Sequence, residues 1–211
     1  MKKLVIFGAS GATGRALVGQ ALAKGHEVTA FIRTPGKLDV RHDCLRLVQG
    51  DVKDQAAVER AVSGNEAVLS TLGVSTPLKH DPAVVQGVGH IVQAMERSGP
   101  ARLIYLSFLG VRDGRHQLGF LLGNILAPLV LRNEVADHEA KEKLIQHSKL
   151  DWTIVRPPKM TGGPRTGIYR NGTDIRTRSI FPTIAREDVA DFMLRQLDDH
   201  TNIRKTMAVM H

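Results

Sequence analysis

The distribution of apolar positions along the chain predicts alternating strands and helices. Apolar runs rich in β-branched residues recur about every 25 to 30 residues between stretches with helical spacing, as in βαβ units. The first run, LVIF, is continuously apolar, which is typical of a strand buried on both faces of a sheet. The predicted strands are residues 4–7, 28–32, 45–48, 67–71, 103–106, 152–155 and a short one at 207–210.

Amphipathic spacing predicts the helices between these strands. They cover residues 14–24, 55–62, 83–97, 117–147 and 186–197, and Pro128 must break or kink the long region. The segment 162–178, rich in Gly, Arg and Thr, is predicted as a loop or an irregular hairpin. No linker divides the sequence. We therefore expect one α/β domain over residues 1–211, a doubly wound parallel sheet flanked by helices.

The net charge of +8 indicates either a nucleic-acid surface or a basic cleft for a phosphorylated small molecule. Lys and Arg are scattered without a run of five, and the aromatic residues that would stack on single strands make up only 4% of the chain. We therefore expect a phosphorylated cofactor and no nucleic-acid partner.

The apolar run before the first glycine is too short for a signal peptide. The longest apolar stretch, residues 119–131, falls short of the roughly 20 residues that span a bilayer. These features predict a cytoplasmic protein without a membrane partner. Cys44 is the single cysteine, so no internal disulfide is expected, and the histidines lack ligand spacing, so no metal site is predicted.

The segment GASGATG places three glycines, each three residues apart, where the first strand gives way to a helix. In a Rossmann-type turn the first glycine allows the tight turn, the second lets N–H groups approach a pyrophosphate, and the third lets the helix pack close to the sheet. The helix N-terminus adds unpaired N–H groups and a positive dipole end. We expect a dinucleotide site rather than a mere tight turn. The expected contacts are Gly8, Ser10, Gly11, Ala12, Thr13 and Gly14.

Arg33 follows the second predicted strand, where an NAD-preferring site usually has Asp or Glu. A guanidinium can form two charge-assisted bonds with the 2′-phosphate of NADP, which a carboxylate would repel. With Thr34 and Lys37 close behind, Arg33 favours NADP(H) over NAD(H), although a solvated strand-end arginine is the alternative.

Two further strand ends belong to the same crevice, because ligands bind beyond the carboxyl ends of parallel strands. Asp51, followed by Val52, can accept from the adenine amino group or cap the next helix. The small-residue stretch with Thr71, Leu72 and Gly73 would let the backbone pass near the cofactor ribose.

The motifs GASGATG, FIRT, GDVKD, STLG, YLSFLG and LDWTIVRPP together resemble those of atypical short-chain dehydrogenases/reductases. The combination of SKLDWTIVRPP with TGIYRNG is similar to the NAD(P)H-binding, NmrA-like branch, which includes the flavin reductase/biliverdin-IXβ reductase group. The resemblance covers essentially the whole chain.

This resemblance also implies the catalytic residues. Full short-chain dehydrogenase sites carry Tyr-x-x-x-Lys on the helix after the fifth strand, and Glu134 and His138 hold those positions here. The flavin/biliverdin reductase group also lacks the pair and uses a serine and a histidine, which match Ser107 and His138. Lys159, just past Pro157, stands where that group has a second histidine, so proton delivery is expected to differ.

By this resemblance Ser107 orients the substrate or the nicotinamide, Pro157 lies beside the cofactor, and His138 donates a proton directly or through water. The alternatives are a strand-end cap for Ser107 and a surface or packing role for His138. The arginines of segment 162–178 are expected in solvent or against a flavin phosphate or tetrapyrrole propionates.

Two function classes remain from the sequence. The first is an NADPH-dependent reductase that transfers hydride to a flavin, a biliverdin-like tetrapyrrole or a quinone-like acceptor, for which proximity supplies much of the rate. The second is an NADP(H)-binding redox sensor without turnover, as in NmrA-type proteins. An epimerase is disfavoured because the tyrosine is missing. The acceptor's identity stays open, as does the choice between monomer and homodimer.

Overall fold

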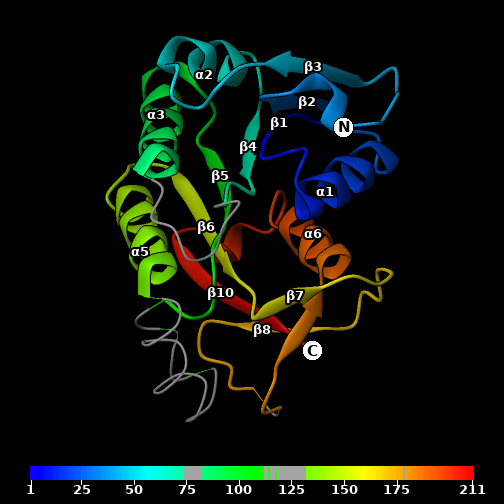
Figure 1. Cartoon of the computed structure of the whole chain (residues 1–211), viewed down its shortest axis with the longest axis vertical. Coiled ribbons are helices and arrows are strands. Elements are labelled where there is room, and N and C mark those ends of the chain that lie inside the picture. The colour runs from blue at the N-terminus through cyan, green and yellow to red at the C-terminus, as the bar shows by residue number, and fades with distance from the viewer. Residues whose placement is uncertain (74–81, 112–113, 115–116, 118–131, 178) are drawn as a thin grey trace.

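The computed structural model describes residues 1–73, 82–111, 114, 117, 132–177 and 179–211. Its main sheet has eight strands in the order β3-β2-β1-β4-β5-β6-β10-β8 (Figure 1). In chain order these strands are β1 (Lys3–Phe7), β2 (Glu27–Ile32), β3 (Leu45–Gln49), β4 (Ala67–Ser70), β5 (Arg102–Leu106), β6 (Asp151–Arg156), β8 (Arg170–Gly172) and β10 (Lys205–Met210). All the pairings are parallel except that of β8 with β10. The predicted doubly wound parallel sheet is confirmed.

Helices cover both faces of this sheet (Figure 1). One face packs against α1 (Ala12–Ala23) and α6 (Arg186–Arg195), and the other against α2 (Gln55–Val62), α3 (Pro82–Ser98) and α5 (Arg132–Gln146). Successive side chains of β1 alternate between the two cores, because Leu4 and Ile6 join one cluster while Val5 and Phe7 join the other. This double burial explains why the strand is continuously apolar.

The predicted elements differ from the observed ones chiefly in the last third of the chain. Segment 162–178 contains β8, and a separate two-stranded parallel sheet joins β7 (Lys159–Thr161) to β9 (Thr183–Ala185). Two short 3-10 helices, Pro35–Lys37 and His200–Asn202, complete the described elements. Of the long helical region only α5 is described, and Pro128 lies outside the described residues.

The strand order changes direction between β1 and β4, so the connections leaving these two strands turn toward opposite ends of the sheet. A crevice opens beyond the carboxyl ends of the strands at such a point. No helix among the described ranges is both long and apolar enough to cross a membrane.

Candidate active site

The glycine turn after β1 has the geometry that a close strand-to-helix approach requires. Gly8 has a φ of +76°, in the left-handed region that favours glycine. A Cβ on Gly14 would lie 2.1 Å from the carbonyl oxygen of Gly8 and 2.8 Å from Cα of Ala9, so a side chain there would push α1 off the strand. Gly11 is the N-cap residue and supplies no side-chain cap, which leaves the first-turn N–H groups of α1 directed beyond the helix end.

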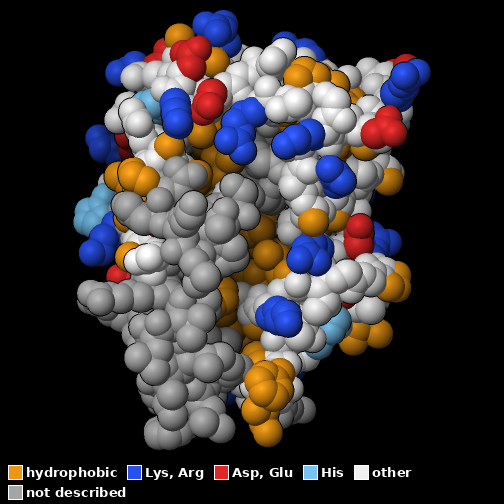
Figure 2. Space-filling view, in the orientation of Figure 1, with side chains coloured by type: hydrophobic (Ala, Val, Ile, Leu, Met, Phe, Trp, Pro, Cys, Tyr) orange, Lys and Arg blue, Asp and Glu red, His pale blue; other side chains and the backbone are white. Residues whose placement is uncertain are grey.

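Two adjoining cavities lie at the carboxyl ends of the strands. The first, which we call the Arg33 cavity, has a volume of about 370 Å³, and the second, the Ser107 cavity, about 250 Å³. Both are lined by Gly11, Thr71, Leu72 and Gly73, so they form one groove that passes over the N-terminus of α1. Figure 2 shows Lys and Arg side chains along one side of this hollowed face and apolar side chains deeper within it.

Most residues singled out from the sequence line this groove. In the Arg33 cavity these are Gly8, Ser10, Gly11, Arg33, Asp51, Val52, Thr71, Leu72 and Gly73. In the Ser107 cavity they are Gly11, Ala12, Thr13, Gly14, Thr71, Leu72, Gly73, Ser107, His138 and Pro157. Three others line neither cavity. Thr34 and Lys37 are exposed, at the N-cap and the last position of the 3-10 helix after β2, and Lys159 is exposed at the start of β7.

Asp51 is not the cap of α2. Its Oδ1 accepts from the N–H of Lys53 at 3.0 Å, within a local turn. The N-cap is Asp54, whose Oδ1 accepts from the N–H of Ala57 at 3.1 Å. The capping alternative for Asp51 is therefore wrong, while its carboxylate stays at the edge of the Arg33 cavity.

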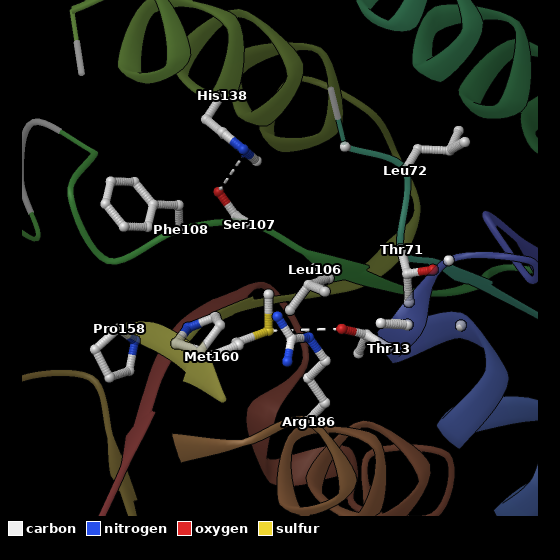
Figure 3. Close-up of a pocket in the computed structure, with 15 residues that line it drawn as sticks. Thr13, Thr71, Leu72, Leu106, Ser107, Phe108, His138, Pro158, Met160 and Arg186 are labelled. Atoms are coloured by element: carbon white, nitrogen blue, oxygen red, sulfur yellow. Dashed lines mark hydrogen bonds between the residues drawn. The ribbon is translucent and has the colours of Figure 1, made fainter. Parts of the chain in front are cut away.

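Ser107 and His138 meet at the inner end of the groove (Figure 3). Beneath them lies a buried ion pair between Glu142 and Arg156. Ser107 Oγ donates to Glu142 Oε1 at 2.5 Å and lies 3.3 Å from His138 Nδ1. Arg156 Nε donates to the same Oε1 at 2.9 Å, and its Nη2 pairs with Oε2. All four side chains are buried. Glu142 therefore links Ser107, which lines the cavity, to Arg156, which does not.

This arrangement fixes the direction of each hydrogen bond. The hydroxyl of Ser107 has one hydrogen, which Glu142 accepts, so His138 Nδ1 must be the donor in the remaining contact. The neutral imidazole then carries its lone pair on Nε2. Burial, together with the positive charges of Lys141 and Arg156, lowers the pKa of His138 from 6.5 to about 3. The protonated form of His138 is therefore scarce at neutral pH, which disfavours the proton-donating role expected of this residue.

Sequence reasoning missed Glu142 and Arg156, and also several residues that line the Ser107 cavity. Glu142 stands one helical turn after His138, and this i,i+4 spacing on α5 was the available signal. Arg156 is the last residue of β6, next to the prolines that end the strand. The other cavity residues that were missed are Leu106, Phe108, Pro158, Met160 and Arg186.

The arginines of segment 162–178 have other partners. Arg165 Nη1 lies 3.5 Å from Asp191 Oδ1, and Arg170 Nη2 donates to the carbonyl of Arg176 at 3.2 Å. Arg178 lies outside the described residues. None of the three described arginines lines the Ser107 cavity.

Comparison with known proteins gives this geometry a context. A family model described as NAD(P)H-binding matches residues 8–200. An uncharacterized chloroplast protein of Arabidopsis thaliana is 31% identical in an alignment of 183 positions that covers 79% of this chain and 62% of that protein. The (4-alkanoyl-5-oxo-2,5-dihydrofuran-3-yl)methyl phosphate reductase of Streptomyces griseus is 28% identical over 154 residues, which are 73% of this chain and 46% of that enzyme. The chain thus spans less than two thirds of the length of these curated relatives.

Among solved structures, the anaerobilin reductase ChuY of Escherichia coli O157:H7 superposes with a TM-score of 0.77. The match covers 98% of this chain and 95% of that one at 20% sequence identity, a level that shows the fold alone. Membership of an NAD(P)H-binding family and the Rossmann-type fold, both expected from the sequence, are confirmed.

Proposed function

Because the chain belongs to the NAD(P)H-binding family, whose model matches residues 8–200, we propose that it is an NADPH-dependent reductase of flavins, tetrapyrroles or other conjugated acceptors. The observation that carries this proposal is the continuity of the Arg33 cavity with the Ser107 cavity over the N-terminus of α1. A dinucleotide is elongated, with two phosphates at its middle, and this groove has its backbone N–H groups at its middle.

The described residues fit such a cofactor. A Cβ at Gly14 would be blocked by backbone, and Gly8 requires its left-handed conformation, so the turn keeps the surface above α1 open to a diphosphate. Arg33 would meet the 2′-phosphate, and Lys53 lines the same cavity as a second cation. When bound, NADPH supplies the hydride.

At the inner end of the groove, the protein orients the reacting rings through Ser107 and His138, and both of these side chains are uncharged. The hydrogen of Ser107 is held by Glu142, so Ser107 Oγ and His138 Nε2 present lone pairs that suit N–H groups of a ring or a carboxamide. No tyrosine lines the Ser107 cavity, and His138 is neutral. Such a site suits an acceptor that spreads the transferred charge over a conjugated system and takes its proton from water.

The named relatives support the reaction class. The Streptomyces griseus relative reduces an oxo-dihydrofuran, a small ring compound, and ChuY is a reductase of anaerobilin. Both names describe reduction, which agrees with a reductase more closely than with a sensor that lacks turnover.

The proposal is tested by pairing NADPH binding with turnover. Calorimetry should detect binding of NADPH, and the purified protein should oxidise NADPH when FMN, FAD or a quinone is added. Ser107→Ala should lower kcat about 10-fold or more while changing the NADPH dissociation constant by less than about threefold, because the hydroxyl orients the reacting rings and lies away from the phosphates. Binding of NADPH without oxidation by any acceptor would replace the reductase with the sensor.

A further inference from the structure

Arg186, the first residue of α6, directs its side chain into the Ser107 cavity (Figure 3). The side chain is half-buried and forms no hydrogen bond or ion pair with any residue that the structure describes. A guanidinium has five N–H donors in a planar fork and stays charged at all physiological pH values. Because no protein group pairs with it in the described part of the chain, this guanidinium can bind an acidic group of a ligand that enters the cavity.

The neighbouring charges are already engaged elsewhere. Glu187 Oε2 accepts from Gln20 Nε2 at 2.6 Å. Asp188 accepts from the N–H of Thr166 at 2.8 Å and lies 3.0 Å from His211 Nε2. The carboxylates that follow Arg186 on α6 are thus occupied. The positive charge of Arg186 is left for a ligand.

The rest of the Ser107 cavity indicates the kind of ligand. Its walls include the apolar side chains of Leu106, Phe108, Pro157, Pro158 and Met160. A flat conjugated ring can pack against such walls. Among the residues lining this cavity in the described part of the chain, Arg186 is the only cation, since His138 is neutral.

We propose that Arg186 binds an acidic group, phosphate or carboxylate, carried by the conjugated acceptor, and thereby makes the site select anionic acceptors over neutral ones. This inference rests on the proposed reductase function. The cofactor diphosphate is a second source of the same chemistry. The acceptor is favoured because the first-turn N–H groups of α1 already suit the diphosphate, whereas the described lining of this cavity offers the acceptor's acid no cation other than Arg186.

FMN and riboflavin form a matched pair of probes, because they share one ring system and only FMN carries a phosphate. Quenching of flavin fluorescence on titration of NADP⁺-saturated protein gives both dissociation constants without turnover. The wild type should bind FMN about 10- to 100-fold more tightly than riboflavin, the range expected for a charge-assisted pair. Arg186→Met should remove this ratio by weakening FMN alone, and Arg186→Lys should restore part of it.

The matched control is Arg60→Met, which removes the same charge from an exposed position of α2 that lines neither cavity. It should leave the FMN-to-riboflavin ratio within about twofold of the wild type, as expected for an exposed charge. Circular dichroism spectra and melting temperatures establish that each variant is folded.

Two results would overturn the inference. The first is that the wild-type protein binds FMN no more tightly than riboflavin, or binds neither flavin. The other is an Arg186→Met variant that keeps the ratio but loses affinity for NADP⁺, which would assign Arg186 to the cofactor diphosphate. The reductase proposal fails separately if none of the acceptors tested causes the wild type to oxidise NADPH. The FMN-to-riboflavin binding ratio can hold in that case.

Discussion

At the scale of single residues, the hydroxyl of Ser107 is governed by a side chain that does not line the cavity. Glu142 holds the hydroxyl hydrogen, and Arg156 holds Glu142. A buried carboxylate is costly unless it is paired and hydrogen-bonded, and both conditions are met here. The pair sets which polar atoms of Ser107 and His138 accept hydrogen bonds, so Glu142 of α5 and Arg156 of β6 influence the cavity without lining it.

His138 gives a prediction about pH. In the unfolded chain its imidazole takes up a proton near pH 6.5, whereas in the folded protein its pKa is about 3. Between these values acidification favours the unfolded state, so stability is lost as pH falls from 6.5 toward 3. The slope from this one group is at most about 1.4 kcal/mol per pH unit. Urea unfolding at pH 7, 6 and 5 should show a shallower decline for His138→Asn than for the wild type. Parallel declines would show that His138 is not the buried neutral imidazole described above.

The sequence could indicate Ser107 and His138 only through the family resemblance. The hydrogen-bond directions could not be predicted, because they depend on Arg156, which is 14 residues from Glu142 along the chain and meets it only after α5 packs on the sheet. The same holds for the depressed pKa of His138, since burial is a property of the folded chain.

At the scale of elements, α1 offers two glycines with opposite expected effects. A Cβ at Gly14 would meet backbone atoms of Gly8 and Ala9 within 2.8 Å, while a Cβ at Gly19, in the same helix, would meet nothing within 4 Å. Gly14→Ala should therefore lower the free energy of unfolding by about 1 to 3 kcal/mol through overpacking. Gly19→Ala should raise it by about 0.5 to 1 kcal/mol through helix propensity.

Chemical denaturation of the two variants measures both effects. Gly14→Ala should also weaken NADPH binding, because displacement of α1 moves its first-turn N–H groups. Equal stability for the two variants would contradict the close approach of helix and strand at this turn.

Elements set by local patterns were predicted well. Helix α2 was predicted with its observed bounds, and the first six predicted strands correspond to β1 through β6. The strands that the pattern did not predict are three residues long and depend on distant partners: Lys159 of β7 pairs with Thr183 of β9, and Gly172 of β8 pairs with Ala208 of β10. Segments this short carry too little periodicity to be distinguished from loops.

At the scale of the whole molecule, the groove brings the strand ends together and includes Arg33 in its lining, so the proposed preference for NADPH is tested at this residue. Arg33→Ala should weaken NADPH binding about 10- to 100-fold while changing NADH binding by less than about threefold, because the lost contact is to the 2′-phosphate alone. Isothermal titration calorimetry with both coenzymes checks this. Arg60→Ala, exposed on α2, is the control for net charge. Equal losses for both coenzymes would remove Arg33 from phosphate recognition.

The two cavities draw on separate stretches of the chain. The Arg33 cavity is built from residues between Gly8 and Val84, whereas the walls peculiar to the Ser107 cavity run from Leu106 to Arg186 apart from the turn of α1. Substitutions in the later stretch can therefore change which ligand the Ser107 cavity admits while the lining of the Arg33 cavity stays the same. With this modular layout, descendants of one ancestral protein can evolve different ligand specificities through substitutions in the second half of the chain.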